Sequence, residues 1–137
     1  MLKAVLDTNI VVSAHLIPDG RQALILGLAY AGRFRWYVSR EILSEYEGVL
    51  LRERFGLNSR RVTKSLRELS RSAALVTPRK KVRICPDSDD DKFIECALEA
   101  RADFVVTGNT CHFPARFQDI RIISPKQFIT HLAAELS

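Results

Sequence analysis

The chain alternates short apolar runs, several of them uninterrupted, with longer segments in which apolar residues recur every three or four positions. The apolar runs predict buried strands over residues 3–7, 34–38, 73–76, 104–107 and 120–123. The helical spacing predicts helices over residues 9–16, 22–31, 40–50, 59–72, 89–101 and 125–136. Strands that alternate with helices and read as continuous apolar runs are typical of a parallel sheet covered on both faces. We therefore expect an α/β fold.

Length and composition are those of one domain. The chain has 137 residues, of which 47% are hydrophobic, and no repeat, low-complexity tract or long linker divides it. No apolar run is long enough to cross a bilayer, and the first residues show no signal-peptide pattern. The cysteines, Cys85, Cys96 and Cys111, are odd in number and lack C-x-x-C spacing. These features predict a single domain over residues 1–137, with no membrane association and reduced thiols, in the cytoplasm.

Charge is distributed unevenly along the chain. The net charge is +5, and basic residues are concentrated between residues 60 and 83, where Glu68 is the one acid. Directly afterwards come four aspartates within residues 87–91. A basic surface beside an acidic pocket suits a polyanion such as RNA, although a solvated helix face would have the same composition. The candidate RNA-binding residues are Arg60, Arg61, Lys64, Arg79, Lys80 and Lys81.

Polar residues directly follow two of the predicted strands, where α/β sheets bind ligands. The first strand ends in Asp7, followed by Thr8 and Asn9. A carboxylate there must be compensated by a cation or by hydrogen-bond donors, although capping of the next helix is an alternative role. Thr107 and Asn109 follow the fourth strand, on either side of a glycine that would allow a sharp turn or a close approach to a phosphate.

Two further acids are candidates on helices. In the helix expected from residue 89, Asp90 lies near the centre of the buried face, and Asp91 lies about 100° away. Asp90 is therefore expected to point toward Asp7, while Asp91 suits a capping role at the helix start. Glu45 lies at the flank of the apolar face of its helix, where most glutamates are simply solvated.

Oxygen ligands without nearby histidine or cysteine favour Mg²⁺ or Mn²⁺ over zinc. Such ions activate water and neutralise charge that develops on a phosphate. We therefore predict a site of Asp7, Glu45 and Asp90, with Asn109 and, as a further candidate, Asp91 as ligands. The three histidines are scattered along the chain and are assigned structural or surface roles, and no P-loop or dinucleotide motif is present.

Four segments in order resemble the motifs of PIN-domain nucleases, in particular the VapC-like branch of toxin components. The segments are DTNI (7–10), SEY (44–46), DSDDDKFIECA (87–97) and VTGN (106–109). The resemblance implies a three-layer α/β/α sandwich with about five parallel strands and Mg²⁺- or Mn²⁺-dependent endoribonuclease activity. It also implies a homodimer and a small antitoxin partner. By position, Asp7, Glu45 and Asp90 match the metal-binding acids of the family, and Asn109 stands where many members have a fourth acid.

Two other functions are compatible with parts of the pattern. An aspartate-nucleophile phosphatase of the haloacid-dehalogenase type also places an aspartate after its first strand. That chemistry requires a second carboxylate two residues later, where this chain has Asn9. A non-catalytic module that binds RNA or protein would use the basic residues and leave the aspartates as helix caps.

Overall fold

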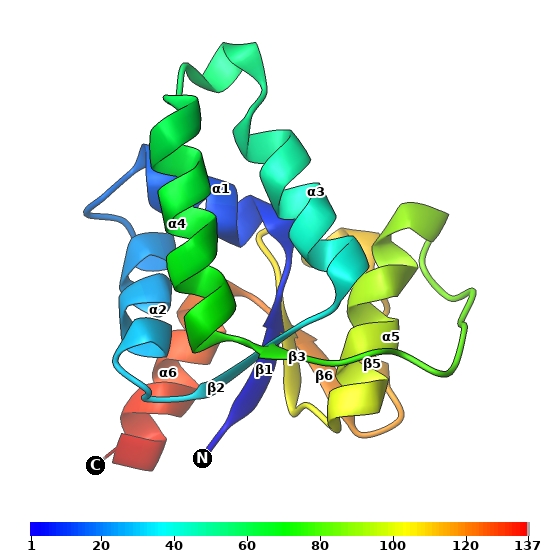
Figure 1. The fold of residues 1–137 in the computed structure, drawn as a ribbon. Helices are drawn as coiled ribbons and strands as arrows, with labels where there is room; N and C mark the ends of the chain where they lie inside the picture. Colours follow the sequence, from blue (N-terminus) through cyan, green and yellow to red (C-terminus); the bar gives the residue numbers. More distant parts are fainter. Residues whose placement is uncertain (137) are drawn as a thin grey trace.

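The computed structural model describes residues 1–136, in which helices cover both faces of one sheet (Figure 1). The first half contains β1 (Lys3–Leu6), α1 (Thr8–Leu16), α2 (Arg21–Tyr30), β2 (Arg35–Val38), α3 (Arg40–Leu50), a 3₁₀ turn (Glu53–Phe55) and α4 (Ser59–Ser72). The second half contains β3 (Ala74–Leu75), a 3₁₀ turn (Ser88–Asp90), α5 (Asp91–Ala100), β4 (Phe104–Val106), a 3₁₀ turn (Thr110–His112), β5 (Arg116–Phe117), β6 (Ile120–Ile123) and α6 (Pro125–Leu136). No helix within residues 1–136 is long and apolar enough to cross a membrane.

Within these residues, six strands form one sheet in the order β3-β2-β1-β4-β6-β5. The expected α/β fold is confirmed, and the five expected strands are β1, β2, β3, β4 and β6, which are parallel to one another. The expectation of about five strands missed β5, which pairs antiparallel with β6. β5 has only two residues, so it shows no alternation that a pattern could reveal. Gln118, with φ of 52°, turns the chain between β5 and β6.

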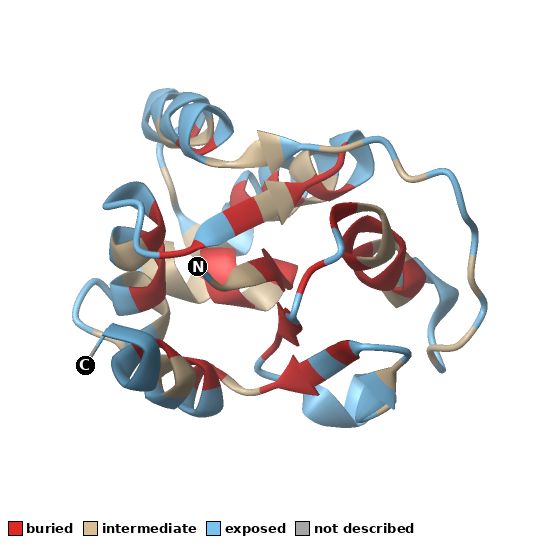
Figure 2. Cartoon of the chain, turned by 90° about the horizontal axis from the view of Figure 1, so that it is seen from below, coloured by how far each residue is buried: buried red, intermediate tan, exposed pale blue. Residues whose placement is uncertain are grey.

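The core lies between the sheet and the helices on its two faces (Figure 2). Val5, Leu6, Val105 and Val106 on the two central strands are all 0% exposed, as expected for strands covered on both faces. α5 packs against β1, β2 and β4, and α2 packs against α6 on the other side of the sheet (Figure 1).

The topology fixes where a site can form. The chain runs outward from β1 through β2 to β3 and then returns to place β4 on the other side of β1. This reversal makes the carboxyl ends of β1 and β4 the ligand-binding position of an open α/β sheet. α3 and α4 project beyond this edge (Figure 1), so α3 supplies a wall beside it.

Candidate active site

Four polar residues from different parts of the chain line one pocket of about 320 Å³ at this edge. They are Asp7 after β1, Glu45 on α3, Asp90 before α5 and Asn109 after β4, and we call this pocket the acid notch. Thr8 and Asn9 also line the acid notch. Thr107 is fully buried and lies beneath it, in hydrogen-bond contact with Asp7. The structure therefore brings together all these predicted site residues except Asp91.

Asp7 is held in place by three hydrogen bonds. The residue as a whole is only 8% exposed. Oδ1 accepts a hydrogen bond from the Thr8 backbone amide at 2.7 Å, and this bond caps α1. Oδ2 accepts from the Thr107 hydroxyl at 2.7 Å and from the Asn9 side-chain amide at 3.3 Å. Burial raises the pKa of Asp7, and the bonds from Thr107 and Thr8 counteract part of this rise. Helix capping and a place in the acid notch are thus compatible roles.

Asp90 is half-buried and is the acid whose charge is least compensated. The first turn of the expected helix is a 3₁₀ turn, so α5 begins at Asp91 instead of residue 89, and the Asp90 side chain forms no capping hydrogen bond to it. Burial, followed by the charges of Asp7 and Asp87, raises the pKa of Asp90 to about 6. An acid whose pKa is raised by neighbouring carboxylates marks a position at which a bound cation gains affinity.

Glu45 has both carboxylate oxygens engaged. Lys92 on α5 places Nζ 2.6 Å from Oε1, and the Thr8 hydroxyl donates to Oε2. The side chain of Lys92 is 13% exposed and that of Glu45 27%. Burial acts to lower the pKa of Lys92, but the hydrogen bond and the charge of Glu45 outweigh it and raise that pKa above its ordinary value. Lys92 itself lines the neighbouring pocket between α5 and the loop before it, so it is a cation fixed against Glu45 at the border of the acid notch.

Sequence reasoning missed three side chains near the acid notch. His112, which had been assigned a structural or surface role, lines it, and its charge acts to lower the pKa of both Asp7 and Asp90. Its position three residues after Asn109 is a signal that could have identified it. Arg54, which lies 4.8 Å from the ring of Phe55, and Phe55 itself also line the notch. They come from the turn between α3 and α4, and no sequence pattern marked them.

The turn after β4 is anchored by side chains on its neighbours. The Gly108 amide donates to Asn9 Oδ1 at 3.2 Å, and the Asn109 amide donates to the Thr107 hydroxyl at 3.0 Å. A Cβ at Gly108 would have Asn9 Oδ1 as its nearest neighbour at 3.6 Å, an ordinary contact, and this glycine has no positive φ. The sharp turn expected at Gly108 therefore does not require a backbone conformation that is special to glycine.

Asp91 points away from the acid notch. It is 4% exposed, and its Oδ1 accepts hydrogen bonds from the Ile84 and Cys85 amides at 3.2 and 2.9 Å. The expectation that Asp91 caps its helix is wrong because the preceding loop folds back onto α5 and offers these amides first. Glu95, one turn later, accepts from the Val82 amide at 3.0 Å in the same way. Asp91 and Glu95 thus attach this loop to α5.

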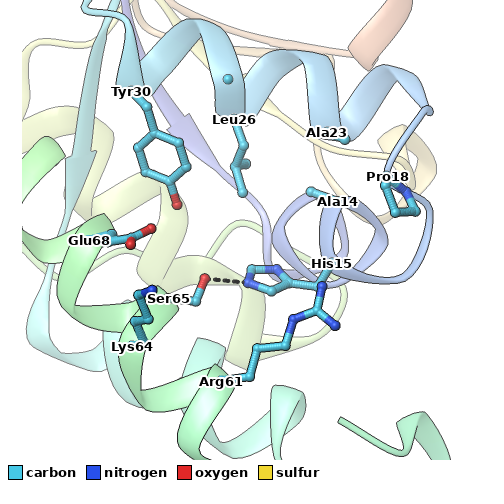
Figure 3. Close-up of a pocket in the computed structure, with 11 residues that line it drawn as sticks. Ala14, His15, Pro18, Ala23, Leu26, Tyr30, Arg61, Lys64, Ser65 and Glu68 are labelled. Atoms are coloured by element: carbon cyan, nitrogen blue, oxygen red, sulfur yellow. Dashed lines mark hydrogen bonds between the residues drawn. The ribbon is translucent and has the colours of Figure 1, made fainter. Parts of the chain in front are cut away.

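The basic stretch between residues 60 and 83 is divided between two sides of the molecule. Arg61 and Lys64 lie on α4 and line a separate pocket of about 440 Å³ next to α1 and α2, together with His15 and Ser65, which are hydrogen-bonded at 2.5 Å (Figure 3). Arg60 lies on the same helix beside Lys64. Arg79, Lys80 and Lys81 belong to the loop on the outer side of α5, where Arg79 pairs with Glu99 at 3.1 Å and Lys81 with Glu41 at 3.5 Å. These residues therefore do not form one continuous patch.

The donor set of the acid notch fits a hard divalent cation. It consists mainly of carboxylate and amide oxygens, without cysteine, although the expectation that no histidine lies nearby is wrong because His112 lines the notch. No group of three or more His, Cys, Asp and Glu side chains within residues 1–136 is close enough to hold an ion by itself. The predicted acids Asp7, Glu45 and Asp90 therefore share one pocket but do not form a ready-made three-carboxylate ion site within the described residues.

Comparisons with known proteins identify the family. A PIN-domain family model matches residues 3–111. An uncharacterized protein of Methanocaldococcus jannaschii, MJ1680, is 30% identical over 141 residues, covering 93% of this chain and 90% of that protein. Two solved structures have a similar fold, each with a TM-score of 0.60. One is VapBC2 from Rickettsia felis bound to a DNA fragment from its promoter, 15% identical, covering 90% of this chain and 98% of the matched chain.

The other is VapBC-1 from nontypeable Haemophilus influenzae, 17% identical, covering 91% of this chain and 99% of the matched chain. Identities this low show similarity of fold alone. The family model spans β1 through the turn after β4 and so includes every residue of the acid notch except His112. The order of the elements, the sheet topology and this match agree, and the chain belongs to the PIN-domain family.

Proposed function

We propose that this chain is a Mg²⁺- or Mn²⁺-dependent endoribonuclease. The observation that carries the proposal is that Asp7 and Asp90 line one notch at the reversal point of the sheet, where burial and the charge of Asp7 raise the pKa of Asp90. Two partly buried acids that repel one another are stabilised when a divalent ion binds between them. When bound, such an ion activates a water molecule and neutralises charge that develops on the scissile phosphate.

The residues around the notch have distinct roles in this proposal. Asp7 and Asp90 hold the ion, with Asn109 as a neutral oxygen ligand. Thr107 and Thr8 orient the Asp7 carboxylate through its two oxygens. Arg54 and His112 line the notch and are placed to contact the phosphates of RNA. Asn9 holds the turn after β4 and occupies the position where a phosphatase of the haloacid-dehalogenase type needs an acid, so the structure gives that alternative no support.

The direct test is cleavage of single-stranded RNA by purified protein with Mn²⁺, compared with the same reaction in EDTA. We expect Mn²⁺-dependent cleavage that Asp7→Asn and Asp90→Asn reduce by on the order of 100-fold or more, because each removes charge that holds the ion. Lys126→Met, at an exposed position on α6 outside the notch, is a control for loss of a surface charge. RNA binding without cleavage in Mn²⁺ would contradict the nuclease and favour the non-catalytic binding module.

We further propose that the protein is the toxin of a toxin-antitoxin pair, acts in the cytoplasm and forms a homodimer. The structures of similar fold are VapBC complexes. Exposed apolar side chains occur on and between α1 and α2, where Leu16 is 40%, Ile17 53% and Leu24 51% exposed. Exposed apolar groups of this kind are typical of protein-binding surfaces. Co-expression with the product of the adjacent gene should yield a co-purifying complex, and light scattering of the isolated chain should give twice the monomer mass. A monomer that captures no such product would contradict this part.

A further inference from the structure

The partly buried pair of Lys92 and Glu45 has no part in the proposed metal coordination. Lys92 Nζ lies 2.6 Å from Glu45 Oε1, and both side chains are largely shielded from water. The Thr8 hydroxyl occupies the other carboxylate oxygen. The charge of Glu45 is therefore balanced by Lys92, and its other oxygen is hydrogen-bonded to Thr8. Asp90, in contrast, makes no capping hydrogen bond, and the negative charge of Asp7 acts on it.

This arrangement divides the three acids into two classes. Glu45 has an ion-pair partner in Lys92, whereas the structure described for residues 1–136 gives Asp7 and Asp90 no ion pair and only the nearby charge of His112. A second divalent ion at Glu45 would have to displace an ammonium group from a charge-assisted hydrogen bond that is partly desolvated, which is costly. Asn109, at the remaining corner of the notch, carries no charge with which to compensate that cost.

We propose, building on the function proposed above, that Lys92, which reaches the border of the acid notch through its contact with Glu45, is a built-in cation that takes the place of a second metal ion. Glu45 then acts as a positioning residue that fixes Lys92 between α3 and α5. A single divalent ion binds at Asp7 and Asp90. The site consequently has two positive charges nearby: a divalent ion that exchanges with solvent, and the permanent ammonium group of Lys92.

The inference is tested by Mn²⁺ binding, measured from the loss of the free-ion electron paramagnetic resonance signal and by calorimetry. The key variant is Glu45→Gln combined with Lys92→Met, which removes one negative and one positive charge together and leaves the net charge of the notch unchanged. We expect one Mn²⁺ per chain in the wild type and in this double variant, with affinities within about threefold of each other. The single change Lys92→Met should raise Mn²⁺ affinity on the order of tenfold, because it removes a nearby positive charge and frees Glu45. Lys81→Met, which removes an exposed lysine, should leave the affinity unchanged.

The outcomes separate the two proposals. Two ions bound by the wild type, or a loss of tenfold or more in the charge-neutral double variant, would show that Glu45 is a metal ligand and overturn the inference alone. A wild type that binds no Mn²⁺ would overturn the metal-dependent function and the inference with it. Circular dichroism checks that each variant is folded. If the double variant is not, Glu45→Gln with Lys92→Gln provides the same charge change with two polar side chains.

Discussion

Replacing Asp90 with asparagine should make the metal-free protein more stable, which is the opposite of the usual effect of a change at a partly buried position. Burial and the charges of Asp7 and Asp87 raise the pKa of Asp90 from 3.8 to about 6. In the unfolded chain the carboxyl titrates near its ordinary value, so between these two pKa values the folded protein holds a proton that the unfolded chain has lost. The free energy of unfolding therefore falls as the pH rises through about 4 to 6, and the penalty is complete above pH 6.

The size of the penalty follows from the shift. Each pKa unit corresponds to about 1.4 kcal/mol, so a shift of this kind has an upper limit of roughly 3 kcal/mol. Solvent screening at a half-buried side chain reduces this figure, and we expect Asp90→Asn to stabilise the protein by about 1–2 kcal/mol at pH 8. That gain corresponds to a rise in melting temperature of roughly 3–8 °C for a domain of this size. At pH 4 the two proteins should be equally stable.

The assay is urea and thermal unfolding in EDTA at pH values from 4 to 8. Asp89→Asn is the matched control, because it removes the same charge from an exposed side chain in the same turn and should change stability by less than about 0.5 kcal/mol. Adding Mn²⁺ should raise the melting temperature of the wild type and leave that of Asp90→Asn almost unchanged. An Asp90→Asn protein that is less stable than the wild type at pH 8, or whose difference from it does not depend on pH, would refute the reasoning.

Three other substitutions probe the framework around the acid notch. Thr107→Val removes a buried 2.7 Å hydrogen bond to Asp7 and should cost about 1–3 kcal/mol in urea unfolding, more at pH 8 than at pH 4; an equal cost at both pH values would contradict the role assigned to this bond. Asp91→Ala leaves two backbone amides of the preceding loop without their acceptor and should cost about 2–3 kcal/mol, with faster proteolysis within residues 77–87; unchanged proteolysis would show that other contacts hold the loop. Tyr46→Phe removes the buried hydroxyl that donates to the Leu6 carbonyl and should cost about 1–2 kcal/mol of thermal stability, whereas no loss would mean that water satisfies this carbonyl.

Much of the fold and part of the site are readable from local sequence. Short apolar runs identified the parallel strands, most clearly β4, which is buried throughout because both faces of the sheet are covered there. β2 and β6 each contain one exposed arginine within the run. Asp7 and Thr107 were marked as candidates because they directly follow such strands, and parallel strands end at one edge of a sheet. The two residues of β5 escaped notice because a pattern needs more positions than this strand has.

Other features exist only in the folded chain, because they depend on contacts between residues that are distant in sequence. The pairing of Lys92 with Glu45 joins two helices, and neither residue differs locally from an ordinary solvated one. The division of the basic stretch arises because α4 and the loop after β3 lie on opposite sides of α3, although they are adjacent in sequence (Figure 1). Helical periodicity already favoured Asp90 over Asp91 as the acid that faces Asp7, but the hydrogen bonds that hold Asp91 exist only because the preceding loop returns onto α5. Local pattern thus determined the scaffold and its ligand-binding edge, and tertiary packing determined which charges meet there.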